Sequence, residues 1–190
     1  MRRLAVILIA VLPLHFSFVS QANLTETNGF EVTEVASDLG IPWGMAFVDD
    51  DRMILTQRDG EAHLLTVSSG AVMPLKGVPR VYDFGQGGLL DVQPSPDFAE
   101  TGWLYFTYSK PTDQSAVTTL ARAKIDGDTL VDWEDLLVTQ SESNRNIHFG
   151  SRIAFDNQGH VFFSVGDRGQ RDLAQQRSNH AGTVIRLTLA

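Results

Sequence analysis

The segment HFGSRIAFDNQGHVFFSVGD, from His148 to Asp167, decides the fold of this chain. An apolar run ends at Phe155, a polar turn follows, and a second apolar run extends to Val165. The turn consists of Asp, Asn, Gln and Gly; Asp, Asn and Gly favour turns because they tolerate positive φ or hydrogen-bond to their own backbone. The flanking runs are rich in Val, Ile and Phe, which favour extended strands. The segment predicts a β-hairpin that brings Asp167, at its end, close to His148, at its start.

The same layout occurs twice more upstream. One copy begins at Pro42 and the other at Gly87, and further apolar strands follow at 62–67, 118–125 and 183–189. Roughly four short strands per unit of about 40–60 residues is typical of a β-propeller. Several strands are apolar on both faces, as in the middle of stacked sheets. We therefore predict an all-β propeller with about three blades in this chain, with a complete small β-sandwich as the competing fold.

Three blades make only part of a ring, since propellers typically have about four to eight. The sequence also stops just after an apolar strand at 184–187. We therefore expect residues 23–190 to form a partial propeller and the chain to be a fragment of a longer gene product. The only helical turn that we expect lies near Ala174.

The first 22 residues predict an export signal. Two arginines precede an apolar run from Leu4 to Val19, and a small-residue site ends at Ala22. This order is typical of a secretory signal peptide. The alternative is a membrane anchor, but the run is short for a spanning helix and is interrupted by Pro13 and His15. We expect a signal peptide over residues 1–22, a periplasmic or secreted mature protein, and no membrane span after cleavage.

The composition argues against several classes of function. The chain of 190 residues carries a formal net charge of -8 and no basic cluster, which argues against a nucleic-acid partner. It contains no cysteine, and therefore no disulfide, thiolate metal site or cysteine nucleophile. It also lacks a Gly-x-Ser-x-Gly elbow, a paired-histidine metal motif and a Rossmann glycine pattern. We identify no metal-ligating residues in this sequence.

Three polar residues are candidates for chemistry, because loops beside the inner strands of a propeller line its central funnel. His148 could act as a general base near neutral pH, or be a solvated loop residue. Asp167 could orient that histidine through a hydrogen bond, or only cap the hairpin. Gln86 offers a donor and an acceptor within the glycine-rich segment 85–91. The glycines there permit close approach of a ligand to the backbone, and an ordinary tight turn is the alternative.

Taken together, these segments resemble the PQQ-dependent glucose/sorbosone dehydrogenase family, in particular its soluble aldose sugar dehydrogenases. Seven motifs occur in family order, with family-like spacing, over about residues 30–190. They are Ile41–Phe47, Thr56–Gly60, Gly85–Asp91, Pro96–Phe98, His148–Arg152, Gly166–Gly169 and Ser178–His180.

The resemblance implies a six-bladed propeller that holds PQQ over its central channel with a calcium ion. It implies that His148 takes the proton from the C1 hydroxyl of an aldose sugar while hydride passes to PQQ. It implies further that Asp167 orients this histidine and that Gln86 and His148 contact the cofactor. Arg152 lies in one of the motifs, but the resemblance gives it no role.

The resemblance also implies that part of the site lies elsewhere. In the family, the calcium ligands and several basic residues that grip the cofactor come from later blades. We therefore expect the isolated chain to be inactive and, because open sheet edges invite association, poorly soluble.

Two other functions stay open. One is a calcium-dependent lactonase on a similar propeller, which would use carboxylates and Asn around a central metal. The other is a binding propeller without catalysis, which would not need Gln86, His148 and Asp167 on one face of the funnel.

Overall fold

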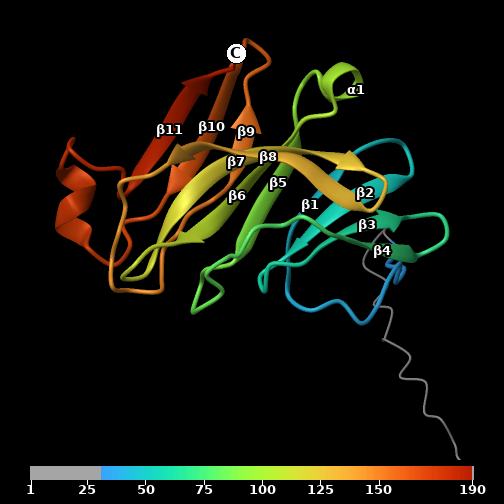
Figure 1. Cartoon of the computed structure of the whole chain (residues 1–190), viewed down its shortest axis with the longest axis horizontal. Helices are drawn as coiled ribbons and strands as arrows, with labels where there is room; N and C mark the ends of the chain where they lie inside the picture. The colour runs from blue at the N-terminus through green and yellow to red at the C-terminus, as the bar shows by residue number, and fades with distance from the viewer. Residues whose placement is uncertain (1–30, 190) are drawn as a thin grey trace, which may run out of the picture. The chain divides into compact units, whose positions relative to one another are not determined.

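Three antiparallel β-sheets, each built from consecutive strands, make up the fold (Figure 1). The computed structural model describes residues 31–189. Blade 1 consists of β1 (Pro42–Phe47), β2 (Arg52–Gln57), β3 (Ala62–Thr66) and β4 (Ala71–Leu75). Blade 2 consists of β5 (Leu89–Pro94), β6 (Leu104–Pro111), β7 (Ala116–Asp126) and β8 (Thr129–Val138). Blade 3 consists of β9 (Ile153–Phe155), β10 (His160–Val165) and β11 (Thr183–Thr188).

Each sheet corresponds to one of the three sequence units. The predicted all-β propeller with about three blades is therefore confirmed, and the two-sheet sandwich is not. Among residues 31–189, only two short helical segments interrupt the strands, α1 (Phe98–Thr101) and the 3₁₀ helix η1 (Arg171–Gln175). The second of these is the helical turn expected near Ala174, whereas α1 lies where we expected a simple turn.

The β9–β10 hairpin forms as its sequence predicts. Phe155 pairs with Val161 and Ile153 pairs with Phe163. Between the strands, Asn157 has φ 55° and Gly159 has φ 86°, values that favour Asn and Gly over other residues. Asp156 Oδ1 accepts hydrogen bonds from the backbone N–H groups of Gln158 (2.8 Å) and His160 (3.1 Å). The first side chain of the turn therefore stabilises the turn.

Other elements differ from the prediction. The outer strands β4 and β8 were not predicted, because their sequences mix apolar residues with proline or acidic side chains and most of their residues are not fully buried. Strand β9 begins at Ile153, not at Phe149 as expected. The backbone before it cannot be extended, since Gly150 and Ser151 have φ values of 75° and 121°.

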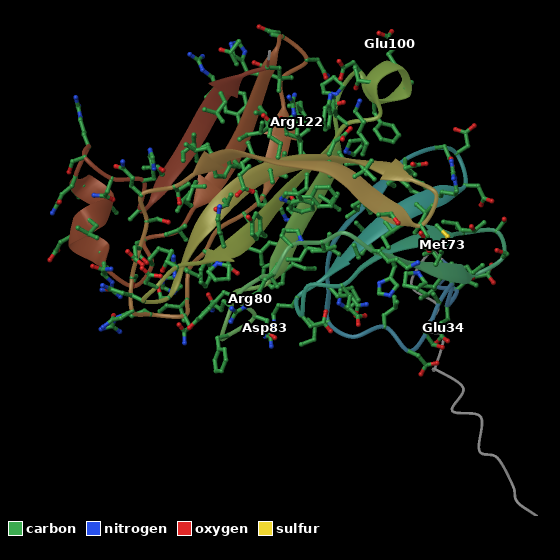
Figure 2. All side chains as sticks on the ribbon, in the orientation of Figure 1. Glu34, Met73, Arg80, Asp83, Glu100 and Arg122 are labelled. Atoms are coloured by element: carbon green, nitrogen blue, oxygen red, sulfur yellow. The ribbon has the colours of Figure 1, made fainter. Side chains whose placement is uncertain are left out.

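Apolar side chains between adjacent blades form the core (Figure 2). Ile54 of blade 1 and Phe106 of blade 2 belong to one buried cluster, and Leu120 of blade 2 and Phe163 of blade 3 belong to another. Burying one such side chain contributes roughly 1.5–3 kcal/mol. Threonine hydroxyls add hydrogen bonds between blades: Thr107 Oγ1 donates to the Ser151 carbonyl over 2.9 Å. These contacts fix the inner strands, and with them the loops that precede those strands.

Every strand of the described residues belongs to one compact unit, Val35–Ala190. The predicted signal peptide, residues 1–22, lies outside the described residues and stays a prediction. Within residues 31–189, no helix has the length and apolar character needed to cross a membrane.

Candidate functional site

His148 and Asp167 form a close pair at the open end of the β9–β10 hairpin. His148 Nδ1 lies 2.6 Å from Asp167 Oδ1, and the same oxygen accepts the Gly169 N–H over 2.8 Å. The hydrogen bond from His148 is the main cause that lowers the pKa of Asp167, and the Gly169 N–H lowers it further. Asp167 is therefore a carboxylate at neutral pH. In the tautomer with a proton on Nδ1, the imidazole donates to this carboxylate and keeps its lone pair on Nε2.

The backbone at His148 is held in an uncommon conformation. Its φ is 55°, in the left-handed region that costs a residue with a side chain roughly 1–3 kcal/mol. Such a conformation persists only where neighbouring groups fix it. One of these groups is Gln86, whose Oε1 accepts the His148 N–H over 2.7 Å. The imidazole is about half exposed, with 49% of the side chain accessible, so Nε2 is open to a ligand.

Gln86 reaches His148 because two loops lie against each other. The Gln86 N–H donates to the Asn146 carbonyl over 2.8 Å, and Tyr82 Oη donates to Asn146 Oδ1 over 2.8 Å. The amide nitrogen of the Gln86 side chain makes no hydrogen bond to residues 31–189. The structure therefore brings Gln86, His148 and Asp167 into one cluster, and their chemical roles stay predictions.

The glycines beside Gln86 fit the ordinary tight turn, one of the two interpretations of this segment. A Cβ would lie 2.3 Å from the Asn146 carbonyl oxygen if added at Gly85, and 1.9 Å from that of Arg58 if added at Gly88. Protein backbone therefore occupies the space beside Gly85 and Gly88. The glycines allow the loops to pack closely, and the polar surface available to a ligand consists of side chains.

Arg168 is a residue of the cluster that the sequence did not identify. Its side chain is buried, with 1% of the residue exposed, and its guanidinium donates four hydrogen bonds to backbone carbonyls. The acceptors are Ile147 (3.0 Å), Ala116 (2.9 Å), Ser141 (3.0 Å) and Arg145 (3.0 Å). Burial lowers its pKa to about 10, so it stays protonated at neutral pH. An arginine in a Gly-Asp-Arg-Gly turn gives no sequence signal of burial.

Arg152 also has a partner that only the structure reveals. Asp91 of β5 is fully buried, and its carboxylate accepts from Arg152 Nη1 (3.0 Å) and from the Ile153 N–H (2.7 Å). The pair fastens the start of β9 to the inner strand of blade 2. Arg152 thus supports the strand that follows the His148 loop.

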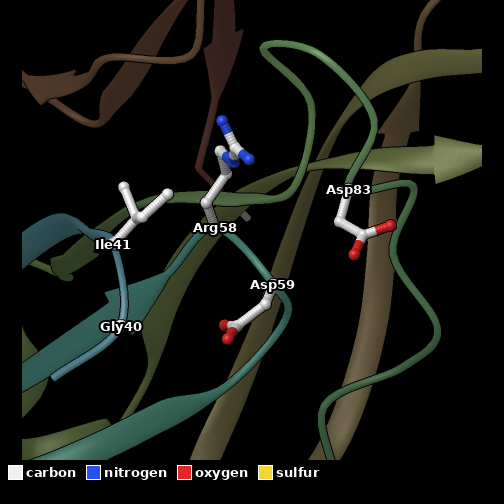
Figure 3. A pocket seen from close by; sticks show the side chains of 5 residues that line it. All are labelled: Gly40, Ile41, Arg58, Asp59 and Asp83. Carbon is white, nitrogen blue, oxygen red and sulfur yellow. The ribbon is translucent and has the colours of Figure 1, made fainter.

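A small pocket of about 130 Å³ lies beside the Gln86 loop (Figure 3). Its lining residues are Gly40, Ile41, Arg58, Asp59 and Asp83. Arg58 Nη1 donates to the Gly85 carbonyl over 3.0 Å, which links this pocket to the loop that carries Gln86. Among residues 31–189, no group of three or more His, Asp or Glu side chains is arranged to hold a metal ion.

Comparison with known proteins shows the family of this chain. Residues 39–190 match the family model described as Glucose / Sorbosone dehydrogenase. The Escherichia coli (strain K12) aldose sugar dehydrogenase YliI is 36% identical over 160 residues, which cover 82% of this chain and 43% of that protein. The Synechocystis sp. protein slr1608 is 33% identical over 189 residues, which cover 89% of this chain and 45% of that protein.

Two solved structures have the same fold. The apo form of the soluble aldose sugar dehydrogenase from Escherichia coli has a TM-score of 0.74 and 34% identity, covering 78% of this chain and 44% of that chain. The PQQ-bound aldose sugar dehydrogenase from Streptomyces coelicolor has a TM-score of 0.73 and 26% identity, covering 83% of this chain and 47% of that chain. The present chain spans about half the length of the relatives it matches.

Proposed function

The chain belongs to the glucose/sorbosone dehydrogenase family, and we propose that it forms the N-terminal part of a PQQ-dependent enzyme that oxidises aldose sugars at C1 to lactones. The observation that carries this proposal is the pair of His148 and Asp167, 2.6 Å apart, with Gln86 fixing the backbone of the histidine.

His148 acts as the general base in this proposal. Its Nε2 takes the proton from the C1 hydroxyl of the sugar, and Nδ1 keeps its own proton in the hydrogen bond to Asp167. The negative charge of Asp167 then stabilises the imidazolium that forms. A correctly placed general base contributes about 10²–10⁴-fold to a rate.

The free polar groups of the cluster fit one edge of a PQQ molecule. The side-chain amide of Gln86 can donate to an oxygen or ring nitrogen of the cofactor, and His148 presents an imidazole edge beside it. When bound, PQQ supplies the two-electron acceptor. These two side chains do not supply the cations that the cofactor's carboxylates require. We assign the basic residues that bind these carboxylates to later blades of the complete protein.

Calcium and cellular location belong to the same proposal. Calcium prefers several oxygen ligands, which we also place in the later blades. The charged n-region, apolar run and small-residue site at the N-terminus support export through a signal peptide over residues 1–22, and thus a periplasmic or secreted enzyme.

The cluster also bears on the two rival functions. A lactonase of the propeller type would gather carboxylates and Asn around a metal, whereas the polar cluster of residues 31–189 is built on one histidine, one aspartate and one glutamine. A binding propeller has no need for a histidine and carboxylate paired on the face that also carries Gln86. The cluster therefore favours a dehydrogenase over a lactonase and over a binding propeller.

The test uses the full-length protein reconstituted with PQQ and calcium. We expect His148→Ala to abolish sugar-dependent dye reduction because the variant loses the base, while PQQ stays bound through Gln86 and the later blades. The matched control is His160→Ala, which removes a histidine from the turn end of the same hairpin and should leave turnover near the wild-type value. Retention of more than a few per cent of activity in His148→Ala would contradict the base assignment. Sugar oxidation by the isolated 190-residue chain would contradict the assignment of the remaining grip to later blades.

A further inference from the structure

The segment that carries His148 has no regular structure of its own. Strand β8 ends at Val138 and β9 begins at Ile153, so the intervening backbone groups need partners outside a sheet. We call residues 139–149 the His148 loop. A long connection of this kind keeps one shape only where other parts of the protein bind its backbone.

Arg168 contributes three of these hydrogen bonds from a single side chain. Its guanidinium donates to the carbonyls of Ser141, Arg145 and Ile147 in the His148 loop, and to Ala116 at the start of β7. The planar fork of a guanidinium can reach several acceptors at once, which a lysine ammonium cannot do with the same geometry. One side chain therefore connects three points of the loop to the start of β7 in blade 2.

The charge of Arg168 is offset by dipoles and by an aromatic ring. Within residues 31–189 no carboxylate forms an ion pair with it, and its Cζ lies 3.6 Å from the centroid of the Phe149 ring. A buried charge without a counter-ion is costly, so a residue that served only to fill space would be apolar. The guanidinium is required by the carbonyls that it binds.

One peptide group shows why this matters for His148. The peptide between Ile147 and His148 has its carbonyl bound by Arg168 Nε over 3.0 Å and its N–H bound by Gln86 Oε1 over 2.7 Å. Hydrogen bonds at both ends fix the plane of this peptide, and the plane sets the φ of 55° at His148. Asp167, next to Arg168 in sequence, holds the imidazole ring.

We propose that Arg168 is a positioning residue for the reaction: it holds the backbone of the His148 loop so that the imidazole, oriented by Asp167, stands where the sugar hydroxyl is presented. Of these two adjacent residues, Asp167 thus orients the imidazole ring of His148 and Arg168 fixes the backbone that carries it. This inference rests on the proposed function of His148 as the base.

The experiment is chemical rescue of Arg168→Ala in the full-length holoenzyme. We expect kcat to fall by at least about 10²-fold with a smaller change in the KM for the sugar, since misplacing a base by about 1 Å has an effect of that size. Added methylguanidinium should restore kcat at least tenfold by filling the vacated site, and methylammonium should not. Arg122→Ala is the control (Figure 2): Arg122 lies on β7, pairs with Glu134 over 2.9 Å, and should show neither loss nor rescue.

A second variant, Arg168→Lys, and a second readout, PQQ binding, keep the test valid if Arg168→Ala does not fold. Arg168→Lys keeps the charge and loses the fork, and we expect a kcat at least tenfold below wild type with PQQ still bound. Wild-type kcat in Arg168→Lys or Arg168→Ala, or rescue by methylammonium as strong as by methylguanidinium, would overturn the proposal.

Hydrogen exchange of the His148 loop separates this inference from the proposed function. An inactive wild-type holoenzyme would refute the proposed function, yet Arg168→Ala should still exchange faster at residues 141–148 than Arg122→Ala. Equal exchange in the two variants would overturn the positioning role, whatever the activity.

Discussion

Replacing Asp167 by Asn tests how the pair works. The structure predicts how the amide will turn, because Asp167 Oδ1 accepts both His148 Nδ1 and the Gly169 N–H. An amide oxygen at that position keeps both hydrogen bonds, whereas an amide nitrogen there would face two donors. The asparagine oxygen should therefore replace Oδ1, so that the tautomer of His148 survives and only the negative charge is lost.

The expected loss follows from this orientation. In the His–Asp pair of the serine proteases, an Asp-to-Asn change makes the histidine present the wrong nitrogen and lowers kcat by about 10⁴-fold. Loss of the charge alone removes only the stabilisation of the imidazolium, which is a part of the 10²–10⁴-fold contribution of a general base. We therefore expect kcat of Asp167→Asn to fall by about 10²-fold, with the KM for the sugar within a few-fold of wild type.

The assay is steady-state dye reduction by the full-length protein loaded with PQQ and calcium, and the chain contains its own control. Asp156 pairs with His160 Nδ1 over 2.7 Å at the turn end of the same hairpin. Asp156→Asn removes an equivalent charge there, and its kcat should stay within twofold of wild type.

Three results would refute the reasoning. A kcat within threefold of wild type would make Asp167 only a cap of the hairpin. A loss of about 10⁴-fold would show that the amide turns the other way. Equal losses in Asp156→Asn and Asp167→Asn would assign the effect to the stability of the hairpin.

Three further predictions concern stability. Asp91→Asn should lower the free energy of unfolding by about 1–3 kcal/mol in urea titrations, because an amide replaces the fully buried carboxylate that accepts from both Arg152 and the Ile153 N–H; an unchanged midpoint would refute this. Gly88→Ala should cost more than about 3 kcal/mol, since its φ is 147° and its Cβ would overlap a backbone carbonyl, whereas Gly127→Ala, with nothing within 4 Å, should cost about 1 kcal/mol; equal costs in thermal melts would contradict the packing argument. The pKa of Asp167 is lower folded than unfolded, so its stabilising effect is present above the unfolded pKa of about 3.9 and is lost as the pH falls through the folded pKa. The Tm of wild type should therefore exceed that of Asp167→Asn at neutral pH, and the difference between the two Tm values should shrink below about pH 4. A difference that stays constant with pH would contradict this.

Much of the fold could be predicted because inner strands leave a strong pattern. Strands β5 and β6 are apolar on both faces, and the β9–β10 turn carries the residues that its backbone angles require. The outer strands β4 and β8 could not be found in this way, since a strand at the edge of a blade is only partly buried and tolerates proline and charge. The pairing of His148 with Asp167 followed from the hairpin, because antiparallel strands bring the two ends of a hairpin together.

The supports of the site could not be predicted from spacing. The bond from the His148 N–H to Gln86 spans 62 residues, and that from Arg152 to Asp91 spans 61. Each connects separate blades, so no local periodicity records it. The glycines near Gln86 allowed two interpretations, a tight turn or room for a ligand, for the same reason: only the neighbouring loop shows that the space is filled.

The sequence alone determined that this chain repeats a strand–turn–strand unit three times and places a histidine and an aspartate at the two ends of the third. These properties are local, set by side-chain polarity and turn chemistry within about 20 residues. The tertiary structure decided that Arg168 is buried, that the glycines pack on backbone, and that Gln86 binds the peptide of His148. The physical reason is that a backbone carbonyl or N–H is the same group in every residue, so the partner that satisfies it is chosen by packing between blades.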